Sequence, residues 1–321
     1  MLVPTLLFLL GLLLLIKGGD WFVDGATGIA RRFHIPEIIV GATVVSIGTT
    51  LPEVMVSATS ALSGHGEIAY GNAIGSIICN TALIAALTVA VRPAPVDRKS
   101  FRTPVIFFFI AAAFYLFNAY AFGGFSRISG IVLLLMFAVY ITMTIRQGLK
   151  EPALESEEIE PARMKPLWMD LLLLAGGAAL IAVGADLLVD NGTLIAEALG
   201  VPESVIALTF VALGTSLPEL VTAITSLAKG HGALSLGNVV GANLFNLVLV
   251  SGLSITLNPF SLPDGKQIAG MNASLVVDVP VMVVSMWLLT IPALIRGKMS
   301  RWQGIILLMI YAAFCVFQFM G

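Results

Sequence analysis

The chain of 321 residues is 58% hydrophobic and only 11% charged, and its formal net charge at pH 7 is −2. This composition is more apolar than the core of a soluble domain requires, so an ordinary soluble domain is excluded. The charge balance gives no sign of a nucleic-acid partner; we expect none, and expect the lipid bilayer as the surroundings. The two cysteines, Cys79 and Cys315, lie inside apolar segments, which argues against a disulfide framework or a zinc site.

Apolar segments long enough to cross a bilayer recur along the whole chain. A spanning helix needs about 20 such residues, and runs such as LLFLLGLLLLI do not alternate as the strands of a membrane barrel would. The N-terminus, MLVPTLLFLL, has no basic region and no A-x-A cleavage site, so we interpret it as the first span. The predicted helical spans are 2–30, 36–62, 69–91, 103–121, 127–147, 167–197, 202–228, 235–257, 271–295 and 301–320.

The sequence repeats itself at a fixed offset of 166 residues. Residues 11–93 align with 177–259 without a gap, and roughly 30 of about 83 positions are identical. Pro36-Glu37 aligns with Pro202-Glu203, and the tripeptide Gly64-His65-Gly66 aligns with Gly230-His231-Gly232. We expect both histidines in loops. The chain therefore contains two copies of one structural unit.

Five predicted spans fall on each side of a short acidic segment. We divide the chain into a first repeat at 1–147, a cytoplasmic linker at 148–166 and a second repeat at 167–321. Because five is odd, the second copy starts on the opposite side of the membrane, as in many secondary transporters. The predicted fold is thus an all-α polytopic membrane protein with ten transmembrane helices, arranged as two inverted five-helix repeats with broken helices at the midplane.

The placement of lysine and arginine predicts the orientation. With the N-terminus outside, only Arg127 and Lys266 fall in outer loops, and Lys17 lies within a span. All other basic residues fall on the inner side, which satisfies the positive-inside rule. We therefore expect a multi-pass protein of the cell (inner) membrane, with both termini outside. The inner basic residues are Arg31, Arg32, Arg92, Arg98, Lys99, Arg102, Arg146, Lys150, Arg163, Lys165, Lys229, Arg296, Lys298 and Arg301.

A proline and a glutamate interrupt the second span of each repeat. The segment GTTLPEVMV at 48–56 returns as GTSLPELVT at 214–222. Proline removes a backbone donor and disfavours helix at the residue before it, so we predict a break around residues 48–50 that frees carbonyl groups. Irregular backbone at membrane depth is tolerated only where it lines a cavity or is covered by protein. The alternative is helix capping, in which Thr50 with Glu53, and Ser216 with Glu219, form capping boxes.

Polar residues on the next span of each repeat share one helical face. Asn72, Ser76 and Asn80 are four residues apart, and the second copy has Asn238, Ala242 and Asn246. Glycines at 71, 75, 237 and 241 allow close helix packing, so the amides could instead bond across helices. Beside two buried glutamates we favour ligation.

The donors gathered in this way are carboxylate, carbonyl, hydroxyl and amide oxygens. Such hard ligands suit Ca²⁺ and Na⁺ rather than Zn²⁺ or Cu⁺. Two carboxylates neutralise one divalent ion or two monovalent ions, so competing cations could exchange at one site. The candidate metal ligands are Glu53, Glu219, Thr49, Thr215, Thr50, Ser216, Ser76, Asn80 and Asn246.

These motifs resemble those of the sodium/calcium exchangers of the calcium/cation antiporter superfamily, of the small prokaryotic type. GATVVSIGTTLPEV and GNAIGSIICN resemble the first family repeat, and LTFVALGTSLPEL and GNVVGANLFN the second. The resemblance covers essentially the whole chain. It implies electrogenic exchange of several Na⁺ for one Ca²⁺ by alternating access around a central site, with no cofactor besides the transported ions.

The resemblance also implies roles for individual residues. Glu53 and Glu219 would ligate Ca²⁺ with the carbonyl groups of Thr49 and Thr215, and sodium would share the glutamates. The sodium ions would also use Ser76, Thr50 and Ser216. The first spans of the two repeats, which carry Asp20, Asp24, Asp186 and Asp190, would slide against the remaining helices.

Two positions depart from the family pattern, and other functions stay open. Asn246 stands where the family often has an acidic residue, and Ala242 replaces a serine. Stoichiometry and the choice between Na⁺ and H⁺ therefore remain open, with a Ca²⁺/H⁺ or other divalent-cation antiporter as the main alternative. A channel would have a similar core, although inverted repeats favour alternating access. An enzyme is not indicated, because the sequence shows neither a nucleophile paired with a base nor an H-E-x-x-H motif. We expect a monomer.

Overall fold

The computed structural model describes residues 2–150, 166–198, 214, 216–263 and 267–319. Within these ranges nine helices are long and apolar enough to cross a membrane, and Leu217–Ala228 forms a shorter apolar helix. The chain is therefore a helical, multi-pass membrane protein. About the first half of the predicted span at 202–228 and most of the predicted linker at 148–166 lie outside the described residues.

The helices follow the predicted order with small differences at their ends. In the first half they are α1 (Leu2–Arg32), α2 (Glu37–Val40), η1 (Gly41–Val45), α3 (Ser46–Leu62), α4 (Gly66–Cys79), η2 (Asn80–Ala85), α5 (Ala86–Val91), α6 (Arg98–Phe122) and α7 (Arg127–Lys150). In the second half they are α8 (Leu167–Ala198), α11 (Leu217–Ala228), α12 (Gly232–Phe245), η5 (Asn246–Val250), α13 (Ser251–Leu257), η6 (Ser274–Asp278), α14 (Val279–Arg296) and α15 (Arg301–Phe319).

One predicted span begins too early. Residues 271 and 272, placed at the start of a helix, form the strand β2 (Met271–Asn272), which pairs antiparallel with β1 (Gln267–Ile268). Gly270 between the strands has a φ of 79°, which a residue with a side chain rarely adopts. The chain turns there, so the helix starts only at Ser274.

The two halves contain equivalent pieces at the 166-residue offset. Both α4 and α12 have 14 residues, and each passes into a π-helical segment at an asparagine, Asn80 or Asn246. π-Helical turns are rare and are often found at functional sites. Across the halves, Arg92 donates to the carbonyl group of Leu227, and Asn258 donates to that of Ala61. These two bonds are equivalent under the repeat.

Short bridges join loops of different halves at both ends of the bundle. Pro95 pairs with Lys298 at one end, and Gly124 pairs with Ser261 at the other. The 25-residue helix α6 runs between the two loops that contribute Pro95 and Gly124, a length of about 37 Å at 1.5 Å per residue. In each bridge the loop that follows the third helical region of one half meets the loop before the last helix of the other half.

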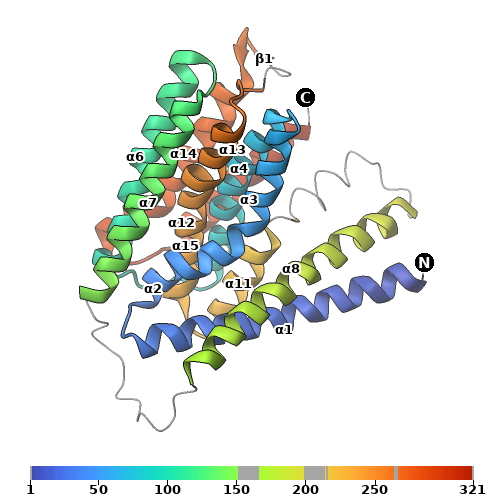
Figure 1. Ribbon diagram of the computed structural model, residues 1–321, viewed down its shortest axis with the longest axis vertical. Coiled ribbons are helices and arrows are strands. Elements are labelled where there is room, and N and C mark those ends of the chain that lie inside the picture. The colour runs from blue at the N-terminus through green and yellow to red at the C-terminus, as the bar shows by residue number, and fades with distance from the viewer. Residues whose placement is uncertain (1, 151–165, 199–213, 215, 264–266, 320–321) are drawn as a thin grey trace.

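The helices α1 and α8 run together across the bundle rather than along it (Figure 1). Their contact is lined by glycine. A Cβ atom at Gly18 would lie 2.9 Å from the carbonyl oxygen of Gly177, and one at Gly184 would lie 2.9 Å from that of Gly11. The backbones thus touch with no room for side chains, a mode of packing that membrane helices favour.

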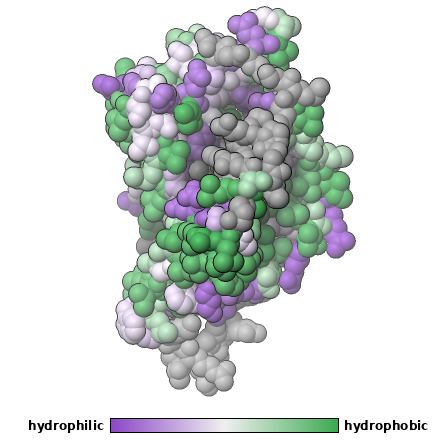
Figure 2. Space-filling view, turned by 90° about the vertical axis from the view of Figure 1, so that its right-hand side faces the viewer, coloured by the Kyte–Doolittle hydropathy of each residue, from purple (hydrophilic) through white to green (hydrophobic). Residues whose placement is uncertain are grey.

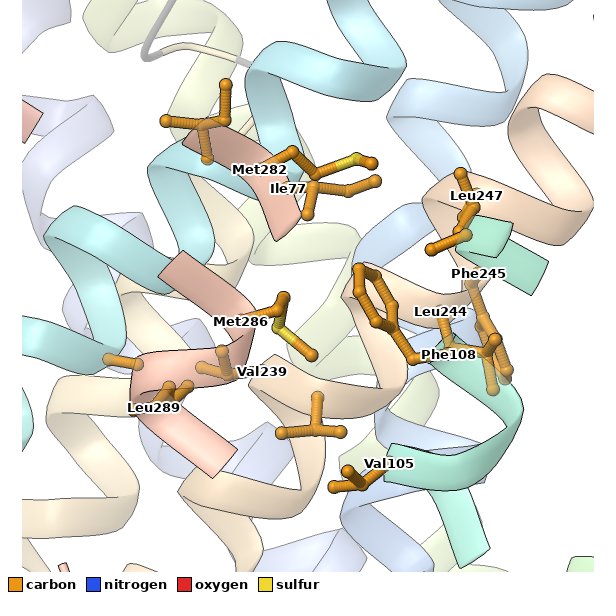
Figure 3. Packing of buried hydrophobic residues seen from close by; sticks show 14 of the residues in the cluster. Ile77, Val105, Phe108, Val239, Leu244, Phe245, Leu247, Met282, Met286 and Leu289 are labelled. Carbon is orange, nitrogen blue, oxygen red and sulfur yellow. The ribbon is translucent and has the colours of Figure 1, made fainter. Parts of the chain in front are cut away.

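The main core lies between α4, α6, α12 and α14. Figure 3 shows Met286 and Phe108 pointing into the space between their helices, beside Val239. The outward surface is also apolar, with leucine, isoleucine and phenylalanine exposed on most long helices. In the face shown in Figure 2, hydrophobic residues form a broad area and hydrophilic residues gather in separate groups. Such a surface suits lipid.

Candidate cation-binding site

The proline of the first repeat does not break its helix, and the predicted break around residues 48–50 is wrong there. The helix α3 continues from Ser46 through Pro52 to Leu62. Proline removes only one intrahelical bond, and a membrane helix absorbs this loss by a local adjustment. The irregular backbone lies upstream instead, in the π-helical segment η1, where Tyr140 donates to the carbonyl oxygen of Ala42 at 2.9 Å.

The second repeat does change conformation at the equivalent place. Helix α11 begins at Leu217, and Ser216 immediately precedes it in a turn. The side chain of Ser216 makes no capping bond, and Thr50 of the first repeat lies inside α3. Capping therefore does not explain these residues. Thr215 lies outside the described residues.

Both glutamates are fully buried. Glu53 on α3 and Glu219 in the first turn of α11 each have 0% of their surface exposed. The helices that carry them, α3 and α11, contact each other. Among the described residues no lysine, arginine or histidine is within ion-pair distance of either carboxylate. Two like charges in one buried place require a cation or protons to balance them.

The asparagine-bearing helices enclose this pair from the opposite halves. The segment η2, which begins at Asn80, packs against α11, and η5, which begins at Asn246, packs against α3. Ser76 is also buried, one turn before Asn80. Each glutamate thus lies on a helix that contacts the asparagine-bearing segment of the other half. The site is built across the repeat.

Most of the candidate ligands hold polar atoms with no hydrogen-bond partner. A buried polar group normally has one, and leaving it unpaired costs about 1–3 kcal/mol. Six candidates keep side-chain oxygen or nitrogen atoms unpaired among the described residues, namely Thr50, Glu53, Asn80, Ser216, Glu219 and Asn246. Both carboxylate oxygens of each glutamate are included. Polar atoms that share this lack of hydrogen-bond partners are expected at a site where a bound ligand supplies the missing contacts.

Thr49 connects the halves. Its hydroxyl group, in the first repeat, donates to Oδ1 of Asn238 in the second, 3.2 Å away. Ser46, one turn earlier, donates to the backbone carbonyl oxygen of Asn238 at 3.0 Å. Ser46 was not among the predicted site residues, although its position four residues before Thr50 on one helical face was a usable signal.

Close packing of α12 against α2, η1 and the start of α3 supports this arrangement. A Cβ atom at Gly241 would overlap the side chain of Ser46, and one at Gly237 would overlap the carbonyl group of Ile38. The predicted role of these glycines in helix approach is confirmed for the second repeat. Gly71 and Gly75 have no such neighbour within the described ranges.

A cavity of about 610 Å³ borders the candidate site at Thr49. It is bounded by α3 and α8 and by Gly214 and Pro218 of the second repeat. Buried Thr49 lies on its wall, as do the exposed residues Asp186 and Asp190 of α8. The cavity thus places two exposed carboxylates and one candidate ligand on the same wall.

The donor set decides which ions fit. It contains two carboxylates, hydroxyl groups and side-chain amides, without a thiolate or imidazole among the candidate ligands. Oxygen ligands of this kind hold Ca²⁺ and other hard cations. The geometry is therefore that of a buried site for small hard cations, open on one side.

A model of the family described as "Sodium/calcium exchanger protein" matches residues 3–146 and 169–320. The chain belongs to the sodium/calcium exchanger family. Members of this family are transporters, so the chain is a cation antiporter by membership. The matched ranges include every described candidate ligand.

Relatives and solved structures agree with membership of the exchanger family. An uncharacterized membrane protein of Methanocaldococcus jannaschii is 36% identical over 313 residues, covering 95% of this chain and 94% of that protein. The sodium/calcium exchanger MaX1 of Methanosarcina acetivorans is 31% identical, covering 99% of each. The structure of the sodium-calcium exchanger NCX_Mj, soaked with Na⁺ and Sr²⁺, is 35% identical with a TM-score of 0.80, covering 97% of each chain.

Proposed function

We propose that the protein exchanges Na⁺ for Ca²⁺ across the membrane, by alternating access around the site between Glu53 and Glu219. One observation carries the proposal: two fully buried carboxylates share one place, and among the described residues no cationic side chain balances them and no donor pairs with their four oxygens. The name of MaX1 and the soaks of NCX_Mj with Na⁺ and Ca²⁺ support these two ions as cargo.

Exchange follows from charge balance. One Ca²⁺ neutralises both carboxylates, and so do two Na⁺ ions, whereas an empty site leaves two negative charges buried at high cost. The protein therefore passes between its two open forms only when the site is occupied. Ca²⁺ and Na⁺ cannot both fill the site, so the inward movement of one ion is coupled to the outward movement of the other.

Each candidate ligand has a role in this proposal. Glu53, Glu219 and the carbonyl groups of Thr49 and Thr215 hold Ca²⁺. Sodium uses the same glutamates, with Thr50, Ser216 and Ser76. Asn80 and Asn246 complete the shell with neutral amide oxygens, which keeps the number of central carboxylates at two.

The architecture that we propose is ten transmembrane helices in two inverted repeats, 1–147 and 167–321, joined by the linker at 148–166. The equivalent asparagine π-helical segments and the paired loop bridges at opposite ends of the bundle support this inversion. We place the end with Pro95 and Lys298 in the cytoplasm and both termini outside, because basic residues concentrate at that end. The membrane is the cell (inner) membrane, and a single chain supplies the whole site, so the monomer is the working unit.

A second candidate, Ca²⁺/H⁺ exchange, is favoured by the asparagine at 246. With only two central carboxylates, two protons balance the site as well as two Na⁺ ions do. Protons need no oxygen shell, so the unpaired hydroxyl groups of Thr50 and Ser216 favour sodium.

The test is ⁴⁵Ca²⁺ uptake into proteoliposomes under an outward Na⁺ gradient, compared with an outward proton gradient. We expect uptake with the Na⁺ gradient and its loss in Glu53→Gln. Glu67→Gln, which changes an exposed glutamate on α4, is the matched control and should transport normally. Uptake with the proton gradient alone would identify the proton-coupled alternative, and uptake with neither would exclude both.

A further inference from the structure

The two halves differ in how the first helix of one meets the second helix of the other. On one side α11 lies directly on α1, where a Cβ atom at Gly19 would be 2.7 Å from both Val221 and Thr225. The residues equivalent to Gly19 and Val221 at the 166-residue offset are Ala185 and Met55, and both line the 610 Å³ cavity. Among the described residues, the contact that is closed on the α1 side is therefore open on the α8 side.

The same difference is found in the aspartates. Asp186 and Asp190 of α8 line the open cavity. Their equivalents on α1, Asp20 and Asp24, are held by Lys229, which directly follows α11.

The ammonium group of Lys229 has an acceptor for each of its three hydrogens in this contact. Its Nζ lies 2.8 Å from Oδ1 of Asp24, 3.0 Å from the backbone carbonyl oxygen of Asp20 and 3.3 Å from Oδ1 of Asp20. An ammonium group has three hydrogens, so these three acceptors match its donors. All three belong to α1, and Lys229 therefore ties the end of α11 to that helix.

The turn that carries Lys229 makes a second contact two residues later. Nδ1 of His231 lies 2.8 Å from Oε1 of Glu37, in the first turn of α2. Gly230 between them has a φ of 86°, which lets the two side chains leave the same tight turn. The turn 229–231 thus reaches α1 with one residue and α2 with another.

The equivalent turn of the first repeat lacks the lysine. It reads Ser63-Gly64-His65, and Gly64 has a similar φ of 83°. Serine carries no charge and is too short to bridge to an aspartate on a neighbouring helix. The repeat therefore preserves the shape of the turn and differs in the charged residue.

We propose that Lys229 is an ionic latch that holds the α1 side of the cation site closed and biases the protein toward the form that is open on the α8 side. This inference rests on the proposed alternating access. For the α1 side to open, α1 must move away from α11, and Lys229 must release Asp20 and Asp24. Opening of the α8 side breaks no equivalent ion pair, because Ser63 stands in place of the lysine.

The Lys229 contact shifts the equilibrium between the two forms but does not prevent either of them. The side chains of Lys229, Asp20 and Asp24 are 26%, 42% and 46% exposed, so water screens their attraction. Exposed ion pairs of this kind shift an equilibrium by roughly two- to five-fold each, and a group with two partners by about three- to ten-fold. A change of this size alters how often the α1 side opens without preventing either state.

The experiment measures opening of the α1 side directly. Val221→Cys places a thiol at the α1–α11 contact, and Met55→Cys places one at the equivalent position in the open cavity. Each is treated in the purified full chain with a water-soluble methanethiosulfonate reagent, and the background from Cys79 and Cys315 is measured in the parent. We expect fast modification at position 55 and slow modification at 221. Adding Lys229→Ser, the residue found in the first repeat, should speed modification at 221 by about three- to ten-fold.

Two further variants guard the interpretation. Lys298→Ser removes an exposed lysine at the same end of the bundle and should leave the rate at 221 unchanged. Lys229→Asp should speed modification, and combining it with Asp24→Lys should restore the slow rate, which a general loss of packing would not do. If Lys229→Ser and Lys229→Asp both leave the rate at 221 as it is with the lysine, the latch is overturned. If the rates respond but no gradient drives Ca²⁺ uptake, the proposed cargo is wrong and the latch stands.

Discussion

Asn72 on α4 donates a hydrogen bond from Nδ2 to the backbone carbonyl oxygen of Glu53, 3.2 Å away. The same nitrogen lies 2.8 Å from Oγ of Ser57, one turn further along α3. Asn72, from the polar face of α4, thus fixes the backbone that carries the Glu53 carboxylate. This contact links the two motifs that the sequence places about 20 residues apart.

We predict that Asn72→Leu, which keeps the volume and removes the donor, weakens Ca²⁺ handling. The variant loses the two part-buried hydrogen bonds to Glu53 and Ser57, which together are worth about 1–2 kcal/mol, and this corresponds to roughly a 10-fold rise in the KM for Ca²⁺. Because Asn72 acts through Glu53, the maximal rate should change less than KM. Uptake kinetics in proteoliposomes measure both, and a lower maximal rate with unchanged KM would count against a positioning role.

We predict that Asn246→Asp changes the number of sodium ions that compete with Ca²⁺. A third central carboxylate would leave one negative charge beside a bound Ca²⁺ and would be balanced by three Na⁺ ions. The Hill coefficient for Na⁺ inhibition of Ca²⁺ uptake should therefore rise by about one, because charge balance sets the occupancy of a buried site. Asn118→Asp, on α6, is the control. An unchanged coefficient in Asn246→Asp would contradict the charge-balance argument.

The helical, multi-pass character of the described chain was predictable because its physical signals are strong. Apolar length and the 166-residue repeat place the long helices to within a few residues, since lipid allows no other backbone. The π-helical segment at 41–45 was not predictable from proline chemistry alone. It depends on Tyr140, which is about a hundred residues away and reaches the carbonyl group of Ala42. A distant partner of this kind leaves no trace in local sequence.

The candidate site was predictable in its ligand types and less so in its connections. The pairing of GTTLPE with GTSLPE identified Glu53 and Glu219, and their burial agrees with it. The bond from Thr49 to Asn238 joins the two halves. It could not be deduced from the repeat, because Asn72, the equivalent of Asn238 in the first repeat, bonds to Glu53 instead. Lys229 differs from Ser63 at the equivalent position, so the repeat itself gave no reason to assign it a role.

Tyr140→Phe tests the support of the π-helical segment. Its hydroxyl group is the donor to the Ala42 carbonyl oxygen, and the side chain is fully buried. Removing it leaves a buried acceptor without its partner, which costs about 1–3 kcal/mol and should lower the Tm by several degrees. Tyr120→Phe removes a bond to the Leu275 carbonyl oxygen from an exposed tyrosine, where water can replace it. Equal Tm losses in the two variants would argue against a supporting role for Tyr140.

Two neighbouring glycines of α8 test the packing against α1. A Cβ atom at Gly177 would overlap the backbone of Phe22, whereas one at Gly176 would meet Trp21 at an ordinary 3.7 Å. Gly177→Ala should therefore separate α1 from α8 and lower both the Tm and Ca²⁺ uptake, with a stability loss of about 1–3 kcal/mol. Gly176→Ala should be tolerated. Equal thermal stability of the two proteins, measured in the same detergent, would show that the helices are not in backbone contact.

The most direct measurement is equilibrium binding of Ca²⁺ to the purified protein in detergent, titrated with and without Na⁺. We predict one Ca²⁺ per chain, displaced by Na⁺, with affinity reduced at least about 100-fold in Glu53→Gln and in Glu219→Gln, because each removes a buried charged ligand. Glu67→Gln should bind as the unaltered protein does. Binding that persists in both glutamate variants, or that Na⁺ does not displace, would contradict a shared central site.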